Sequence, residues 1–296
     1  MRPVSPVAPV DSVPRVSTVG VLAPGAMGTA LGGCLAAGGH RVLTSLAGRS
    51  AATVARTTLE DAGTVADLVR AVDVLMLVVP PGAARDAGRD VAAACDATGA
   101  RPLVVELDAV APTTVTAIAA DLPGDLVDGA ISGPPPRPES GAPTRVFLSG
   151  PRAAEVAALT APGVRWIELD GPVGAASAAK MCTASVRKGF QALLVQALVT
   201  ADEHGVLPAV LEDVRLDFPD AGIVPAAVAA TKAWRFVDEM TEIATTQAAA
   251  GLTPALADGL AAVYRDLATS AWGARQPGEV PAHLDDTTGL RPGDGT

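Results

Sequence analysis

A glycine-rich segment near the N-terminus contains the residue types that a phosphate-binding loop needs. The stretch VGVLAPGAMGTALGG (19–33) places Ala23, Gly25 and Gly28 in the three glycine positions of a Gly-x-Gly-x-x-Gly pattern. The glycines of such a loop let the backbone approach a pyrophosphate at the N-terminus of a helix. A strand pattern precedes the motif and a helix pattern follows it, so we interpret it as a dinucleotide site rather than a structural turn. The residues predicted to contact the cofactor are Ala23, Pro24, Gly25, Ala26, Met27 and Gly28.

The end of the second predicted strand indicates which dinucleotide would bind. NAD-preferring loops carry an Asp or Glu there, which accepts hydrogen bonds from the ribose hydroxyls. The segment TSLAGRS (44–50) has no acid but contains Arg49 and Ser50. An arginine beside hydroxyl groups suits a 2′-phosphate, so NADP(H) is expected in preference to NAD(H). The alternative is that Arg49 lies in solvent and binds nothing.

A lysine in the second half of the chain has an open local setting. Lys180 follows the small-residue segment GAASAA, so no bulky neighbour in that segment would shield its ammonium from a facing ligand. On a helix, Thr183, Ala184 and Arg187 would fall on or near the same face. An ordinary solvated lysine is the alternative, and sequence context alone leaves both interpretations open.

The elements that must position these residues alternate between apolar runs and alanine-rich segments. Fully apolar strands separated by helices are typical of a parallel sheet covered on both faces. We therefore predict a Rossmann-type, doubly wound α/β domain over residues 16–170. The predicted strands are 17–23, 40–47, 73–80, 101–107, 124–132, 144–150 and 165–169, and the predicted helices are 26–39, 50–63, 64–72 and 83–97.

The pattern becomes helical from Gly171 onward. Residues 171–205 read as one long helix, and 226–251 and 254–272 as two more, so an all-α domain is expected over 171–275. The long helix is apolar over most of its C-terminal half, which is more than one Rossmann domain can cover. The flanking segments 1–15 and 276–296, rich in proline or in Pro, Gly and Asp, are expected to be disordered.

Composition narrows the class of protein. The 296 residues carry a formal net charge of −10, which argues against a nucleic-acid partner. The three cysteines form no CxxC pair and the three histidines lack metal-ligand spacing, so no metal site is expected. No apolar run is long enough to span a bilayer and the N-terminus lacks a signal-peptide pattern. We therefore expect a cytoplasmic protein that acts on a small molecule, without a membrane partner.

Five stretches, in this order, resemble the β-hydroxyacid dehydrogenase family, which includes 6-phosphogluconate and 3-hydroxyisobutyrate dehydrogenases and imine reductases. The likeness covers nearly all of residues 19–268, and WRFVDEMTEIATT (234–246) resembles a branch with a distinctive C-terminal helical domain. The five stretches are GVLAPGAMG (20–28), LVVPPGAA (77–84), VVELDAVAPTTV (104–115), DGAISGPP (128–135) and GPVGAASAAKMCTASVRKG (171–189).

The resemblance implies roles for individual residues. Lys180 would be the general acid, which donates a proton to the substrate heteroatom as hydride arrives from the nicotinamide. Ser132 and Gly133 would hold a polar group of the substrate, commonly a carboxylate. The family likeness also implies an intertwined homodimer whose active site is completed across subunits. The loop implied to cross the cofactor contains Val79, Pro80 and Pro81.

The chain departs from the family pattern around this lysine. The hydroxyacid dehydrogenases have asparagines at the positions of Thr183 and Ala184, and of these two only Thr183 can still hydrogen-bond a substrate. Asp108 stands where the family often has asparagine, and it could act as a second acid–base residue. Arg187, Lys188 and Arg235 are candidates to restore positive charge near the substrate, and the alternative for each is a surface charge.

Three hypotheses follow. The first is an NADP(H)-dependent reductase, or the reverse dehydrogenase, that acts on a small carbonyl or hydroxy compound with Lys180 as proton donor. The second is an imine reductase on the same scaffold, in which Asp108 could orient an iminium. The third is an NADP-binding protein without turnover.

Overall fold

The computed structural model of the chain describes residues 17–217 and 232–270, so the segments predicted to be disordered, 1–15 and 276–296, lie outside the described residues. The chain forms two compact units. We call the first the sheet unit; it runs up to Val79 and includes Asp86–Leu107 and Ile118–Val173. The second, the helical unit, comprises Pro80–Arg85, Asp108–Ala117 and the residues from Gly174 onward.

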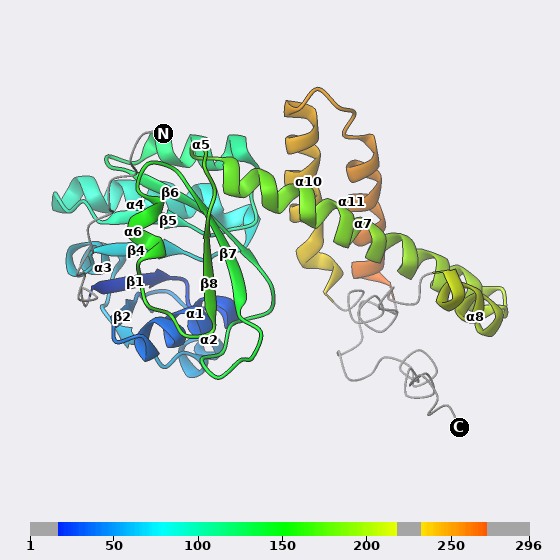
Figure 1. Cartoon of the computed structure of the whole chain (residues 1–296), viewed down its shortest axis with the longest axis horizontal. Coiled ribbons are helices and arrows are strands. Elements are labelled where there is room, and N and C mark those ends of the chain that lie inside the picture. The colour runs from blue at the N-terminus through cyan, green and yellow to red at the C-terminus, as the bar shows by residue number, and fades with distance from the viewer. Residues whose placement is uncertain (1–16, 218–231, 271–296) are drawn as a thin grey trace, which may run out of the picture. The chain divides into compact units, whose positions relative to one another are not determined.

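The sheet unit is built on eight strands in the order β3-β2-β1-β4-β5-β6-β7-β8 (Figure 1). Its first six strands have the order of a dinucleotide-binding sheet, in which ligands bind where the strand order reverses beside β1. This confirms the predicted doubly wound α/β fold. The strands are β1 (Thr18–Leu22), β2 (Arg41–Thr44), β3 (Glu60–Asp61), β4 (Val74–Leu77), β5 (Leu103–Glu106), β6 (Leu126–Ser132), β7 (Thr144–Ser149) and β8 (Val164–Glu168).

The prediction of a parallel sheet is wrong at one pair of strands. β6 and β7 are antiparallel, whereas β7 and β8 are parallel. The cause is the connection: a proline-rich loop without a helix joins β6 to β7, and a parallel return would need a crossover segment. The chain therefore turns back directly beside Ser132.

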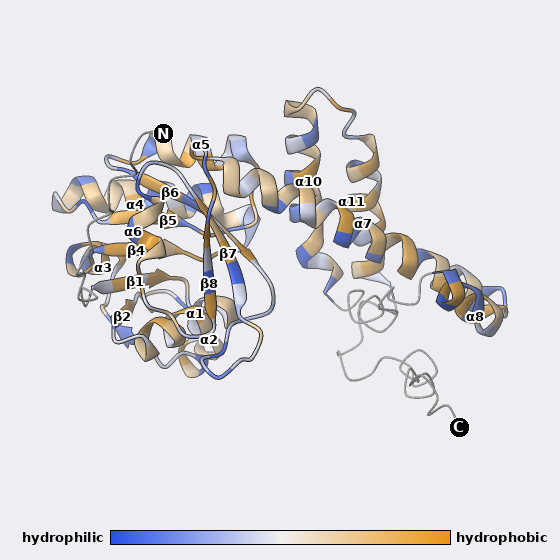
Figure 2. Ribbon diagram, viewed as in Figure 1, coloured by the Kyte–Doolittle hydropathy of each residue, from blue (hydrophilic) through white to orange (hydrophobic). Residues whose placement is uncertain are grey.

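Helices pack on both faces of the sheet. Leu31 and Leu35 of α1 join Val19 and Val21 of β1 in one buried cluster. On the opposite face, a Cβ at Gly20 would lie 3.3 Å from Leu68 of α3. Figure 2 shows the apolar character of the strands between these layers. The helical elements between the strands and before α7 are α1 (Ala26–Ala37), α2 (Ala51–Arg56), α3 (Val65–Ala71), η1 (Pro81–Ala83), α4 (Ala84–Thr98), α5 (Pro112–Asp121) and α6 (Ala153–Ala157).

The helix predicted over 50–63 is wrong beyond Arg56. The chain becomes extended at Thr57 and forms the short strand β3, which pairs with β2. Leu59 fills the space above Gly32, where a Cβ would lie 2.8 Å from its side chain. Tertiary packing therefore overrides the local helix pattern here.

The helical unit confirms the predicted long helix and all-α character. α7 (Ala175–Glu203) has 29 residues and is about 43 Å long. α10 (Ala233–Ala249) and α11 (Ala255–Thr269) lie side by side and cross α7 (Figure 1). α8 (Leu207–Asp217) is a further helix, which is not among the predicted ones. The core includes Met181, Leu198, Met240, Ile243 and Tyr264. Of the helices in the described ranges, none has the length and apolarity needed to cross a bilayer.

Candidate functional site

The loop between β1 and α1 has the features of an anion site. Gly25 is the N-cap of α1, makes no side-chain cap hydrogen bond, and is followed by no acid in the first turn. The first N–H groups of the helix therefore lack intrahelical partners and lie at the positive end of its dipole. A Cβ at Gly25 would meet nothing within 4 Å, whereas one at Gly28 would lie 3.1 Å from Val21 Cγ1. Gly25 thus leaves room for a ligand, and Gly28 allows close packing of helix on strand, as a bound dinucleotide requires.

Ala23 adopts the conformation that the missing first glycine would supply. Its φ is +60°, and it is the sole non-glycine with positive φ among residues 17–217 and 232–270. A left-handed alanine costs about 1–2 kcal/mol. The Gly25 N–H donates to the Ala23 carbonyl oxygen at 2.7 Å, which helps to hold the turn. A strained residue of this kind is typical of a functional loop.

The predicted adenosine end of the site lies after β2. Arg49 is exposed and forms no ion pair with any described residue. Ser50 caps α2, because its hydroxyl accepts the Thr53 N–H at 3.3 Å. Asp61 also lies at this loop and is not among the predicted site residues; its Oδ1 accepts the Leu46 N–H at 3.1 Å. Asp61 belongs to β3, where a helix was predicted, so nothing in the sequence placed it beside the β2 loop.

The predicted substrate-side turn follows β6. Ser132 is half-buried, and Gly133 has a φ of +151°, which favours glycine. The Thr144 hydroxyl donates to the Pro134 carbonyl at 2.8 Å and fixes the turn. Arg145 of β7 donates from Nη2 to Ser132 Oγ at 3.3 Å. A cation of β7 thus lies beside Ser132, where the sequence predicts none.

The remaining predicted site residues lie at the end of β4 and in the helical unit. Lys180 is half-buried near the start of α7, and Thr183 is exposed with its hydroxyl donating to the Lys180 carbonyl at 3.1 Å. Asp108 is buried, with 3% of its surface exposed. Arg235 is exposed at the start of α10. Val79 follows β4, Pro80 is the N-cap of η1, and Pro81 is its first residue.

A buried ion pair lies on the same helix as Lys180. Lys188 contacts the Glu239 carboxylate, and its Nζ lies 3.4 Å from the centroid of the Phe236 ring. The pKa of Lys188 is lowered to about 8, chiefly by burial; Glu239 opposes this shift, and Lys180 and Arg235 add to it. These three cations therefore form one basic cluster within the helical unit. Lys188 is one of the candidate cations named from the sequence, and in the structure its charge is paired with Glu239.

A second acid of α10 holds the segment that carries Asp108. Glu242 Oε2 accepts the Ala111 N–H at 2.6 Å and the Thr114 hydroxyl at 2.8 Å. Because Ala111 and Thr114 lie at the N-terminus of α5, the carboxylate caps that helix and complements its dipole. From the sequence, the stretch 234–246 predicts only a resemblance to one branch of the family. In the structure, Glu242 of this stretch holds the N-terminus of α5.

The fold is that of the 3-hydroxyacid dehydrogenases and 6-phosphogluconate-dehydrogenase-like proteins, a group that includes 3-hydroxyisobutyrate dehydrogenase and imine reductases. A protein of this fold has been solved with NADPH. Residues 201–267 match a domain of unknown function, DUF1932. The sequence has no match among curated proteins.

Three solved structures illustrate the similarity. A conserved protein of unknown function, described as similar to 3-hydroxyacid dehydrogenases, is 28% identical with a TM-score of 0.63, covering 85% of this chain and 96% of its own. Mycobacterium tuberculosis 3-hydroxyisobutyrate dehydrogenase, solved with L-serine, is 20% identical with a TM-score of 0.66, covering 90% and 99%. Streptomyces aurantiacus imine reductase is 23% identical with a TM-score of 0.50, covering 90% and 99%.

Proposed function

We propose that the protein is an NADP(H)-dependent oxidoreductase that interconverts a small carbonyl compound and the corresponding hydroxy compound. The observation that carries the proposal is the β1–α1 loop: an uncapped helix N-terminus, open space at Gly25 and a strained turn at Ala23, at the switch point of the sheet. Such a loop binds the pyrophosphate of a dinucleotide. The fold likeness supports a nicotinamide cofactor.

The residues of the chain have distinct roles in this proposal. NADPH supplies the hydride that the carbonyl carbon accepts. Lys180 donates a proton to the carbonyl oxygen, and takes it back in the reverse direction. Ser132 and Gly133 bind the acidic group of the substrate through a hydroxyl and a backbone N–H. Thr183 donates its proton to the Lys180 carbonyl, so its oxygen stays free to accept one from the substrate.

A buried carboxylate supports a second candidate, reduction of a C=N bond. Asp108 is buried, and an anionic Asp108 would attract an iminium ion. The test compares NADPH oxidation with two panels, 2-oxo and 3-oxo acids in one and cyclic imines in the other. Turnover of the oxo acids supports the first candidate, and turnover of imines alone supports the second. NADPH binding without turnover of either panel would leave a binding protein and contradict both.

We predict that Arg49→Ala weakens NADPH binding about tenfold and leaves NADH binding unchanged, because only NADPH has a 2′-phosphate for the guanidinium. Fluorescence titration of both cofactors measures the ratio. Arg89→Ala is the control, since Arg89 is also exposed but pairs with Asp86 on α4. Equal losses for NADH and NADPH would contradict the assignment of Arg49.

We also propose that the protein is a homodimer in which the helical units intertwine. Apolar side chains are exposed on α7 and α11: Val186 is 73% exposed, Leu193 55% and Leu256 66%. Val186 and Leu256 line an apolar groove of about 200 Å³ with Met240, Ile243 and Leu260. A second copy of the chain would bury this surface and gain about 25 cal/mol per Å² of apolar area.

Light scattering after size exclusion is expected to give twice the chain mass of 29.5 kDa. Val186→Asp would place a charge in the proposed interface and shift the protein toward the monomer. Val54→Asp is a control, because Val54 is also exposed but lies on α2 of the sheet unit. A wild-type protein that stays monomeric at high concentration would overturn the dimer.

A further inference from the structure

We propose that Ser132, Arg145 and Arg165 form an anion-binding row that accepts a second oxyanion group, so that the substrate carries two acidic groups. We call these three residues the arginine row. The assignment to the substrate rests on the proposed function, but the row itself rests on the sheet. Its ligand is a carboxylate or phosphate group, in addition to the acidic group bound at Ser132 and Gly133.

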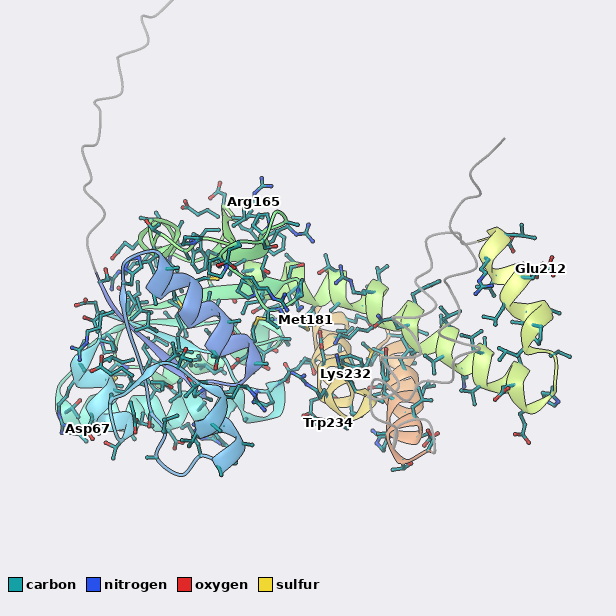
Figure 3. All side chains as sticks on the ribbon, turned by 90° about the horizontal axis from the view of Figure 1, so that it is seen from below. Asp67, Arg165, Met181, Glu212, Lys232 and Trp234 are labelled. Atoms are coloured by element: carbon teal, nitrogen blue, oxygen red, sulfur yellow. The ribbon has the colours of Figure 1, made fainter. Side chains whose placement is uncertain are left out.

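Strand register places the three side chains side by side. Ser132 of β6 is opposite Arg145 of β7, and Arg145 is opposite Arg165 of β8. Residues directly opposite on neighbouring strands point to the same face, and the strands are about 4.8 Å apart. The hydrogen bond from Arg145 to Ser132 Oγ confirms the shared face for the first pair. The row therefore extends from the predicted substrate turn to Arg165 at the margin of the sheet unit (Figure 3).

No acid of residues 17–217 or 232–270 forms an ion pair with Arg145 or Arg165, although the sequence has 32 acidic and 22 basic residues. Like charges directly opposite on adjacent strands are destabilising. A charge on the edge strand β8 can prevent pairing with another sheet, so the charge of Arg165 has an explanation without a ligand. Arg145 lies on the interior strand β7, where this reason does not apply.

The backbone beneath the row is fixed. Thr144 is 4% exposed; its hydroxyl donates to the Pro134 carbonyl, and its N–H donates to the Gly163 carbonyl at 2.9 Å. These bonds tie together the turn after β6, the start of β7 and the start of β8. The backbone that carries Arg145 and Arg165 is thus fixed before a ligand arrives, which reduces the backbone ordering that binding requires.

The donor set selects the ligand class. A guanidinium presents a planar fork that matches carboxylate and phosphate oxygens. Ser132 Oγ accepts from Arg145, so its own hydrogen is free to donate to an anion. Arg145 can share the acidic group that binds at Ser132, and Arg165, next in the register, presents a second guanidinium for the further group. A monoanion would leave Arg165 without a ligand.

The test measures anion binding to cofactor-free protein by NMR of the arginine side-chain Nε–H groups. The probes are acetate, succinate and inorganic phosphate. We expect succinate or phosphate to bind at least about tenfold more tightly than acetate. Arg165→Gln should abolish this difference, and Arg145→Gln should weaken all three probes. Arg70→Gln is the matched control, because Arg70 is an exposed arginine of the sheet unit that pairs with Asp67.

The outcomes separate this inference from the proposed function. Tighter binding of phosphate supports a phosphorylated substrate, and tighter binding of succinate supports a dicarboxylate; both support the row. Equal affinities for all probes in wild type, or unchanged affinities in both variants, would overturn it.

NADPH is titrated into the same samples to separate the two proposals. Anion binding without NADPH binding would refute the oxidoreductase and leave the arginine row. NADPH binding without anion binding would refute the arginine row and leave the oxidoreductase. Arg145→Lys keeps the charge without the fork, and circular dichroism verifies that each variant is folded.

Discussion

Lys180→Met is expected to lower kcat by a factor of about 10²–10⁴, the usual contribution of a positioned general acid. Methionine retains much of the volume of lysine but cannot donate a proton to the carbonyl oxygen. NADPH affinity should stay near the wild-type value, because the proposed phosphate contacts come from the β1–α1 loop and Arg49 and not from Lys180. Steady-state kinetics with an active oxo acid and a fluorescence titration of NADPH measure the two effects.

The chain provides a matched control for this experiment. Lys232 is an exposed lysine at the N-cap of α10, also in the helical unit (Figure 3). Lys232→Met removes the same charge and is expected to leave kcat within about twofold, as for a surface residue away from the reaction. If Lys180→Met keeps full activity, the proton comes from another group and Asp108 becomes the first residue to test.

Glu239→Gln is expected to lower the free energy of unfolding of the helical unit by about 3–5 kcal/mol at neutral pH, as for other buried pairs that lose one partner. The side chains of Lys188 and Glu239 are only 14% and 8% exposed, so the ammonium would remain buried without its counter-charge. Urea unfolding followed by circular dichroism measures the change. The double variant Lys188→Met/Glu239→Leu removes both charges and should be close to the wild type in stability.

The pH dependence gives this second prediction a separate test. The pKa of Lys188 is lowered from its ordinary 10.5 to about 8 in the folded protein. Between these values the unfolded chain holds a proton that the folded chain has released, so the contribution of Lys188 to stability increases as pH rises from 8 to 10.5. Lys188→Met should lack this increase. In Glu239→Gln the increase should begin at a lower pH, because Glu239 raises the pKa of Lys188. An identical pH profile in all three proteins would show that Lys188 does not titrate there.

The fold could be predicted from the sequence because the patterns that indicate strands, loops and helices each lie within a short segment of the chain. The apolar run before Ala23, the glycines and the alanine-rich segment after them predict a strand, a loop and a helix in order. The errors occur where distant residues decide the structure. Leu59 packs against Gly32 and turns a predicted helix into β3. A loop too short for a crossover reverses β7.

In the candidate site, too, residues in local motifs could be predicted and contacts between distant residues could not. Ser132 and Lys180 could be named from motifs, and their roles stay predictions. Their neighbours could not be named, because contacts between residues far apart along the chain depend on register and packing. Arg145 reaches Ser132 only through the antiparallel pairing of β6 and β7. Glu239 reaches Lys188 only because α7 and α10 pack together.

The packing around Tyr264 gives the protein an optical label of its own. The chain has a single tyrosine, and Tyr264 is completely buried. Its ring contacts Phe236 edge to face, and its hydroxyl donates to the Lys188 carbonyl at 2.7 Å. Burial raises the pKa of this phenol, so alkali produces phenolate absorbance only as the helices around it separate. Ultraviolet difference spectroscopy in a rising pH jump would therefore time the opening of the helical unit without an added dye.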